Sequence, residues 1–426
     1  MYLLGLIRQV KLRILRSHNI RDRLLYVLKG VLLRQHVNDR GNNMLSRADQ
    51  GFSKGLETPS QERLSRICVV CDFQGSNPIG AMARRVGRGM GSSVIFANTE
   101  ATTWLYNPIM RSLSRFEHTM DGIIASVASS AETHLHLELG MFGNSLELMR
   151  KNVLKIISNS LGLVVFFHSL HMNDETFAPI YKDILFAIEK HKQNGRCCIW
   201  VNNEKDALLV KKYFSGRLIH APVLYFNQRL RARLIESGAR RRAKRTSSTR
   251  TVGVFGYING HKDFETTLRA LSLLPEYFHL KIVGGVHPGE RKLSEKNPNI
   301  VAIDNFLWSM RDTGICDRIT FVDGLGDWDF FSEMASLDVV VINYLETAMS
   351  ASSVLSQALE IGVPIVASRC TTFELAQQHF GKAYEMFDPG NSLQLRQKIL
   401  ESTGNTTRFR TACIPSLEGF CMDLGQ

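Results

Sequence analysis

The chain has 426 residues with 44 % hydrophobic side chains, so it is long enough for two or three domains and can bury sizeable cores. No apolar run reaches the length of a membrane span or of a secretory signal core, which argues against an integral membrane protein. The eight cysteines are scattered, and around Cys68-x-x-Cys71 residues three apart on a strand point to opposite faces, so we interpret the cysteines as reduced core residues of a cytosolic protein.

The net charge of +12 is concentrated at two places, and the first is an N-terminal extension, residues 1–62. Its first 35 residues hold eight Lys and Arg side chains against one acidic side chain, with Leu and Ile between them at helical spacing. This pattern predicts a basic amphipathic helix. Two interpretations stay open: the helix lies on an anionic membrane surface, or it packs on the protein's own surface. Residues 36–62 are polar and are interpreted as linker.

Strands and helices alternate over residues 63–228. We expect strands at 66–73, 92–98, 122–128, 161–169, 197–203 and 217–226, and helices at 81–90, 145–160, 181–193 and 206–214. Such alternation is typical of a doubly wound parallel sheet. This part is therefore predicted to be an N-terminal Rossmann-like domain.

The second basic cluster is residues 229–250, which ends in Ser and Thr just before the next strand. We interpret it as a solvated linker between domains. A nucleic-acid site is the alternative, although the cluster lacks interleaved aromatic side chains.

The alternation restarts over residues 251–402, and residues 403–426 form a tail. We expect strands at 251–258, 279–285, 318–324, 338–344 and 364–368, and helices at 263–275, 329–337, 352–362, 373–381 and 391–403. The predicted fold class is α/β, with two tandem Rossmann-like doubly wound domains facing each other across a cleft. In such sheets ligands bind beyond the carboxyl ends of the strands.

One strand-end loop of the second domain leads into a helix through small residues. The helix predicted to start near Ser352 follows Ser350, and Ser353 is in its first turn. A phosphate could approach the unpaired backbone N–H groups there, at the positive end of the helix dipole. Simple N-capping by serine is the alternative, because most serine-capped helices bind nothing.

Two further loops contain glycine turns. Gly256 ends the first strand of the second domain and Lys262 follows before a helix, while Gly284 ends the next strand. A lysine can reach a phosphate as a point charge. The three loops together predict a site for a diphosphate-bearing ligand.

The order and spacing of these motifs resemble a known family over about residues 250–402. The stretches VFGYINGHKDFETTLRAL, LKIVGG, ITFVDG, SLDVVVINY, SASSVLSQALEIGVPIVAS and TTFELA occur in that order. They resemble the nucleotide-sugar-binding half of the retaining group 1 (family 4-like) glycosyltransferases, which have the GT-B fold. The resemblance implies that Lys262 binds the donor diphosphate, and that Tyr257 takes the place of a partnering Arg.

The E-x7-E motif of that family is altered in this chain. Gln357 takes the place of the second Glu, which bonds the donor ribose, and the first Glu aligns near Met349, three residues after Glu346. The stretch SASSVL is similar to a sub-branch with a Ser-Gly-Val-Leu type of loop. Glu374 matches the Glu that follows the final strand. A carboxylate favoured by the helix dipole is the alternative for Glu374.

The resemblance implies that the first domain, residues 63–228, is the acceptor-side domain, although this domain resembles the family less clearly. The loop of residues 74–80 takes the place of the acceptor-side glycine-rich loop. The strand LVVFFHS ends in His168, where many members have a His near the transferred sugar, and His171 follows. A hydrogen-bonded loop histidine is the alternative for both.

Two patterns imitate metal sites. Asp327-Trp-Asp329 is a D-x-D, but it precedes a helix, so an Asp N-cap is the better interpretation. His134, His136 and Glu138 alternate, which would place them on one face of a strand. Without a fourth ligand, we interpret that face as solvated and predict no metal site.

The sequence thus predicts a hexosyltransferase-type glycosyltransferase that moves a sugar from a nucleotide diphosphate sugar to an acceptor hydroxyl, with retention, in surface polysaccharide or glycolipid synthesis. The expected catalytic residues are His168 and Lys262. The expected donor-binding residues are Gly256, Tyr257, Lys262, Gly284, Ser352, Ser353, Gln357 and Glu374.

No cofactor is expected besides the donor substrate, because Lys262 and the helix dipole supply positive charge. The expected partners are the nucleotide sugar and a carbohydrate or lipid-linked acceptor, with no nucleic acid. The expected location is the cytoplasm, with peripheral contact at the cytoplasmic membrane face through residues 1–35. A catalytically degenerate GT-B binding protein and a nucleotide-sugar epimerase stay open as alternatives.

Overall fold

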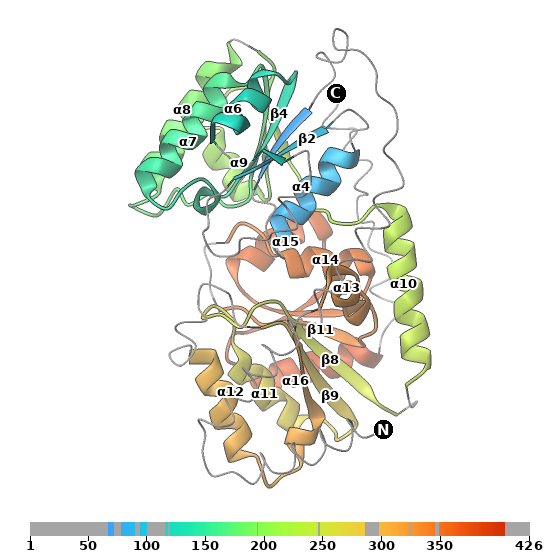
Figure 1. Ribbon diagram of the computed structural model, residues 1–426. Coiled ribbons are helices and arrows are strands. Elements are labelled where there is room, and N and C mark those ends of the chain that lie inside the picture. Colours follow the sequence, from blue (N-terminus) through green and yellow to red (C-terminus); the bar gives the residue numbers. More distant parts are fainter. Residues whose placement is uncertain are drawn as a thin grey trace.

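The computed structural model shows two α/β domains, one above the other in Figure 1. It describes residues 67–71, 78–89, 94–99, 116–117, 120–193, 195–245, 248–285, 298–323, 325–345 and 349–404. The basic N-terminal extension, the loop 72–77 and residues 405–426 lie outside these ranges, so the expectations placed on them stay predictions. Within the described ranges, none of the helices combines the length and the hydropathy needed to cross a bilayer.

The first domain is built on a seven-stranded parallel sheet with the order β3-β2-β1-β4-β5-β6-β7. Its strands are β1 (Ile67–Cys71), β2 (Val94–Asn98), β3 (Phe116–Glu117), β4 (Glu132–Leu137), β5 (Gly162–Phe167), β6 (Cys197–Val201) and β7 (Arg217–His220). Its helices are α4 (Pro78–Gly89), α6 (Met120–Ala128), α7 (Leu146–Asn159), α8 (Ala178–Lys192) and α9 (Glu204–Val210). Every residue of β1, β5 and β6 is buried, which is why these strands are nearly continuous apolar runs.

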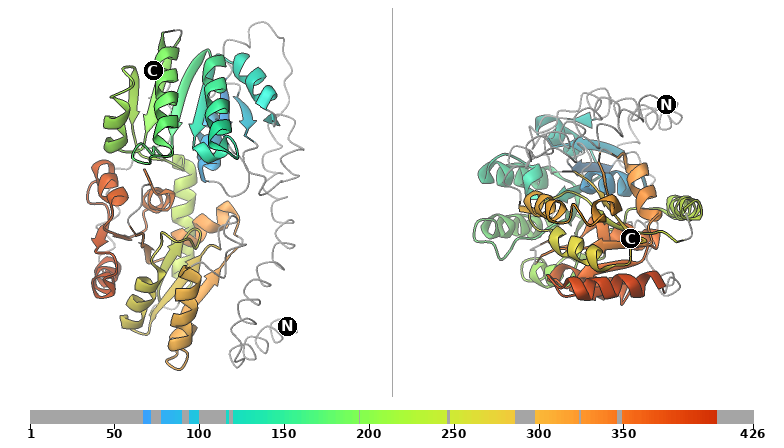
Figure 2. Two further views of the ribbon diagram at one scale, coloured as in Figure 1. Left: turned by 90° about the vertical axis from the view of Figure 1, so that its left-hand side faces the viewer. Right: turned by 90° about the horizontal axis from the view of Figure 1, so that it is seen from below.

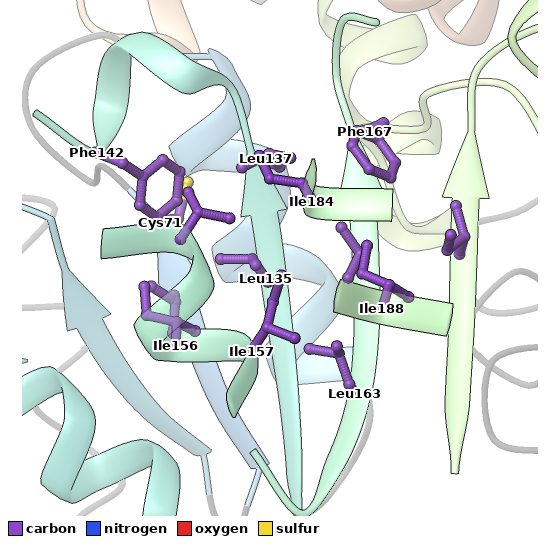
Figure 3. Close-up of a cluster of buried hydrophobic side chains, with 14 of the residues drawn as sticks. Cys71, Leu135, Leu137, Phe142, Ile156, Ile157, Leu163, Phe167, Ile184 and Ile188 are labelled. Atoms are coloured by element: carbon purple, nitrogen blue, oxygen red, sulfur yellow. The ribbon is translucent and has the colours of Figure 1, made fainter. Parts of the chain in front are cut away.

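The core of this domain is packed between the sheet and its helices. Figure 3 shows side chains of the central strands meeting those of α7 and α8, among them Leu135, Leu163, Ile156, Ile157 and Ile184. The cysteines of the described ranges are free, and those of β1 and β6 are buried, as predicted.

The prediction of a strand at residues 122–128 is wrong. This segment belongs to helix α6, in which Ile123 and Val127 stand four residues apart and are both buried. A short apolar run fits a strand and a helix equally well, because it is too brief to show a period.

The basic segment after β7 was predicted to be a solvated linker, but most of it is a helix. Helix α10 (Gln228–Ala243) begins at Asn227, whose side chain accepts a hydrogen bond from the Leu230 N–H at 2.8 Å. Leu234 and Gly238 are buried, and Arg241 forms an ion pair with Glu333 at 2.7 Å. The helix therefore lies along the second domain, as Figure 1 shows, and is more than a solvated connection.

The second domain has a six-stranded parallel sheet with the order β10-β9-β8-β11-β12-β13. Its strands are β8 (Arg250–Phe255), β9 (Phe278–Val283), β10 (Ile319–Val322), β11 (Val339–Ile342), β12 (Ile365–Ser368) and β13 (Glu385–Phe387). Its helices are α11 (Phe264–Leu273), α12 (Pro298–Ser309), α13 (Asp327–Ala335), α14 (Ser353–Ile361), α15 (Thr371–Phe380) and α16 (Ser392–Gly404). Of these, α12 and β13 were not predicted.

The two domains share one hydrophobic cluster at their junction. Met82 and Val86 of α4 and Trp200 of β6 belong to the same cluster as Phe331 and Leu355 of the second domain. Figures 1 and 2 show α4, α14 and α15 between the two sheets. The strand-end loops of the second domain that carry the predicted anion site therefore lie at this junction.

Candidate active site

Two glycines bring the ends of β8 and β9 into contact. Gly256 has φ +87° and Gly284 has φ +142°, a region that side-chain-bearing residues rarely adopt. A Cβ on Gly284 would overlap the carbonyl oxygen of Gly256, and a Cβ on Gly256 would lie 3.0 Å from Lys262 Nζ and 3.6 Å from Val354. The absence of side chains at these two positions lets both loops, Lys262 and the start of α14 meet.

Lys262 is buried at this meeting point, with only 4 % of its surface exposed. Its Nζ donates a hydrogen bond to the Phe255 carbonyl oxygen at 2.7 Å, and no ion pair to it is found among the described residues. Burial lowers the pKa of its amine to about 7, because the charged form is poorly solvated there. A bound anion would supply the missing negative charge.

Tyr344 links Lys262 to the start of α14, and the sequence did not single it out. Lys262 Nζ lies 5.8 Å from the centre of the Tyr344 ring, and the Ser352 hydroxyl donates to the Tyr344 hydroxyl oxygen at 3.4 Å. The two predicted features therefore adjoin one another across this tyrosine.

The start of α14 shows the serine cap that was one of the two alternatives weighed for it, and the anion site stays a prediction. Ser352 is the N-cap, and its hydroxyl oxygen accepts a hydrogen bond from the Leu355 N–H at 3.3 Å. The N–H groups of Ser353 and Val354 have no hydrogen-bond partner within the described ranges. A helix leaves its first N–H groups unpaired, so capping by Ser352 still leaves two donors for an anion.

Gln357 is one turn further along α14. It is 5 % exposed, and its side chain makes no hydrogen bond with the residues that the structure describes. Its amide atoms are not among the fully enclosed polar atoms that lack a partner, so water or a ligand can reach them.

Two other predicted donor residues are less enclosed. Tyr257 is half-buried and directly follows Gly256. Glu374 is in the first turn of α15 with 51 % of its side chain exposed, and it lies 3.7 Å from the Arg369 guanidinium. The structure does not place Glu374 in contact with Lys262, Ser352 or Gln357.

The far end of α14 carries a buried carboxylate that the sequence did not reveal as unusual. Glu360 accepts hydrogen bonds from the backbone N–H groups of Tyr225 at 2.7 Å and Phe226 at 2.9 Å. Both belong to the connector, residues 221–227, which leads from the first domain into α10. Burial raises the pKa of Glu360 to about 8, although these two N–H donors oppose that shift.

A cavity of about 260 Å³ lies between the domains, beside the loop that precedes α14. Its lining includes His171, Asp174, Asn203 and Asp206 from the first domain, with Met349 and Ser350 from the second. Asn203 Nδ2 donates to the Ser350 carbonyl oxygen at 2.9 Å, and its Oδ1 accepts from the Asp206 N–H at 2.8 Å. Burial raises the pKa of Asp206, whose carboxylate accepts from Asn203 Nδ2 at 3.0 Å.

The predicted solvated face on β4 is wrong. His134 and His136 are fully buried, because β4 is a central strand whose two faces are both covered. His134 Nε2 pairs with Glu132 at 2.6 Å, and His136 Nδ1 lies 3.0 Å from His168 Nε2. Within the described ranges, no group of three or more His, Cys, Asp or Glu residues is arranged to hold a metal ion.

The predicted Asp N-cap of α13 is also wrong. Gly326 is the cap, and Asp327 and Asp329 lie in the first turn of the helix. Both carboxylates there interact favourably with the positive end of the helix dipole, which explains the spacing without a metal.

The sequence has no match among protein-family models and none among curated proteins. Several solved structures are similar. HepE from Anabaena in complex with UDP aligns with a TM-score of 0.56 and 13 % identity, over 84 % of this chain and 94 % of that one. Sucrose-phosphate synthase from Thermosynechococcus elongatus aligns with a TM-score of 0.57 and 14 % identity, over 85 % and 98 % of the two chains. WaaG, a glycosyltransferase involved in lipopolysaccharide biosynthesis, aligns with a TM-score of 0.53 and 13 % identity, over 84 % and 99 %.

These similarities extend over both domains. At identities this low they show the fold alone, and that fold is two Rossmann-like domains in the GT-B arrangement, as the sequence predicted.

Proposed function

We propose that this GT-B protein transfers a sugar from a nucleotide diphosphate sugar to an acceptor hydroxyl, with retention of configuration. The observation that carries the proposal is the meeting of Gly256, Gly284, Lys262 and the capped start of α14 at the domain junction. A close glycine turn, an unpaired lysine and free helix-start amides are the elements that bind a diphosphate without a metal ion.

In the proposed reaction the bond between the anomeric carbon and the diphosphate oxygen breaks. The acceptor oxygen forms the new bond, and the acceptor proton passes to the departing diphosphate. Lys262 and the N–H groups of Ser353 and Val354 would stabilise the negative charge that develops on this leaving group. Gln357, with its unpaired side chain, would contact the nucleoside, and Tyr257, which follows Gly256, would lie near the diphosphate. Glu374 would join them only if its link to Arg369 opens.

The cavity beside Ser350 is the proposed place for the acceptor. In its lining, His171 is half-buried and Asp174 is exposed, and both offer hydrogen-bonding groups of the kind that sugar hydroxyls use. A carbohydrate or lipid-linked acceptor is proposed, and residues 1–35 would hold the protein at the cytoplasmic membrane face. No cofactor or metal is required in this scheme.

The test is the thermal stability of the purified protein with UDP, GDP, ADP, TDP and CMP, starting with UDP because HepE was solved with it. A ligand that binds only the folded state raises the melting temperature according to its binding free energy. We expect one diphosphate to raise the melting temperature and Lys262→Ala to abolish that shift. Lys281 forms an ion pair with Glu333 and serves as the control, so Lys281→Ala should retain the shift. Absence of any shift with well-folded protein contradicts the proposal.

A non-catalytic nucleotide-binding protein is the second candidate. It is favoured by Met349, which stands where the resembling family has its first Glu, and by the pairing of Glu374 with Arg369. This candidate would be supported if a diphosphate binds but chromatography detects no release of sugar from any nucleotide sugar.

A further inference from the structure

Two histidines of the first domain form a buried pair that the donor site does not use. His136 comes from β4 and His168 directly follows β5, and the two strands pair with His136 opposite Phe166. His136 Nδ1 lies 3.0 Å from His168 Nε2. His136 has no exposed surface and His168 has 9 % exposed.

Both rings are held in place by stacking. The His136 ring lies 4.3 Å from the Phe166 ring at an interplanar angle of 3°, and 5.3 Å from the His168 ring at 19°. Burial lowers the pKa of His168 to about 3 and that of His136 well below its usual value. The pair is therefore neutral near pH 7, and a single proton lies between the two rings.

The surroundings of His136 decide which ring donates that proton. If His168 Nε2 donated it, the proton of neutral His136 would sit on its own Nε2, which is buried without a hydrogen-bond partner. Orphaned buried N–H groups are rare in folded proteins. If His136 Nδ1 donates instead, its Nε2 is left only with an unused lone pair. This second arrangement places the remaining proton of His168 on Nδ1.

The proton on His168 Nδ1 would be open to a ligand. This atom makes no hydrogen bond with the part of the chain that the structure describes. The His168 carbonyl oxygen accepts from Asn202 Nδ2 at 3.1 Å, and the Asn202 carbonyl oxygen contacts His379 of α15 at 2.8 Å. Asn202 therefore links His168 to His379 of the second domain.

We propose that His136 is a positioning residue that holds His168 as a neutral hydrogen-bond donor, with its proton on Nδ1, at the carboxyl end of β5. The inference rests on the proposed function, in which this N–H would bind an oxygen of the transferred sugar or of the acceptor. His168 would then not act as the general base, in agreement with transfer of the acceptor proton to the leaving diphosphate.

The test is long-range ¹H–¹⁵N correlation NMR on protein labelled with ¹⁵N-histidine, with signals assigned by their loss in His136→Asn and His168→Gln. We expect His168 to carry its proton on Nδ1 in the natural chain. His136→Phe keeps the stacking but removes the donor, so the ¹⁵N signal of His168 Nε2 should lose the shift that an accepted hydrogen bond causes. His136→Asn can donate from its amide and should restore that shift. His279→Phe, a control at the start of β9, should change nothing.

Release of nucleoside diphosphate from the nucleotide sugar is the second readout. The rate of this release should fall about five- to tenfold in His136→Phe, which is the factor for one lost neutral hydrogen bond. In His136→Asn the rate should largely recover. A proton on His168 Nε2 in the natural chain, or an unchanged His168 Nε2 signal in His136→Phe, overturns the inference whatever the turnover. If no nucleotide diphosphate binds, the proposed function fails and the ligand role of His168 fails with it, while the tautomer assignment is judged separately by the spectra.

Discussion

Binding of a nucleotide diphosphate should be coupled to uptake of a proton by Lys262. In the free protein burial holds the pKa of this amine at about 7, against an ordinary value of 10.5. At pH 8 about nine-tenths of the Lys262 side chains would be neutral. A diphosphate placed beside the amine favours its charged form, so complex formation should take up about 0.9 proton at this pH.

The size of the pH effect follows from the same two values. If the bound diphosphate restores the ordinary pKa, the affinity should fall about twentyfold between pH 7.5 and pH 9. The phosphate groups titrate near pH 6, so they contribute little in this range.

Isothermal titration calorimetry in two buffers of different ionisation enthalpy measures the proton uptake directly. Lys262→Arg should bind without this pH dependence, because a guanidinium stays charged throughout. Equal heats in both buffers, together with an affinity that does not change from pH 7.5 to 9, would refute the assignment of Lys262 to the diphosphate.

Three further predictions concern the elements that hold the site together. Gly284→Ala should lower the free energy of unfolding by roughly 2 kcal/mol or more, because the added Cβ overlaps Gly256 at a position with positive φ. The control Gly260→Ala places its Cβ in open space and should change that free energy by less than about 0.5 kcal/mol. Urea titrations measure both, and equal effects would contradict this prediction. Asn203→Ala removes the cap of α9 and a bond between the domains, so it should cost about 1–2 kcal/mol by thermal unfolding, and a neutral result would exclude a structural role for the contact. The stability advantage of the natural chain over Glu360→Gln should shrink as pH rises from 5 to 8, since the folded state keeps a proton on Glu360 that the unfolded state releases near pH 4.5; an advantage that grows with pH would be the contrary outcome.

Most of the fold could be predicted because buried parallel strands leave a strong local pattern. Runs such as those of β5 and β6 are apolar at every position, and helices of several turns lie between them. Helix α6 was missed because its apolar run is too short to show a helical period. Helix α10 was taken for linker because its charge pattern suggested solvent on all sides, whereas the buried face is set by the neighbouring α13.

The site could be predicted only where its chemistry is local in the sequence. Gly256, Lys262 and Ser352 were found because a strand end, a glycine and a helix start follow one another along the chain. The partner of Asn203 is 147 residues away, and that of His136 is 32 residues away, so nothing in the neighbouring sequence indicates either contact. The burial of His134 and His136 likewise depends on where β4 stands in the sheet.

Helix α14 connects the proposed diphosphate site to the connector, residues 221–227. Its first turn lies at the proposed diphosphate site. Its last turn carries Glu360, which accepts two backbone hydrogen bonds from the connector between the domains. Nine helical residues make a stiff rod of about 13 Å. We therefore expect binding at the proposed diphosphate site to alter the contact of Glu360 with the connector, and with it the angle between the two domains.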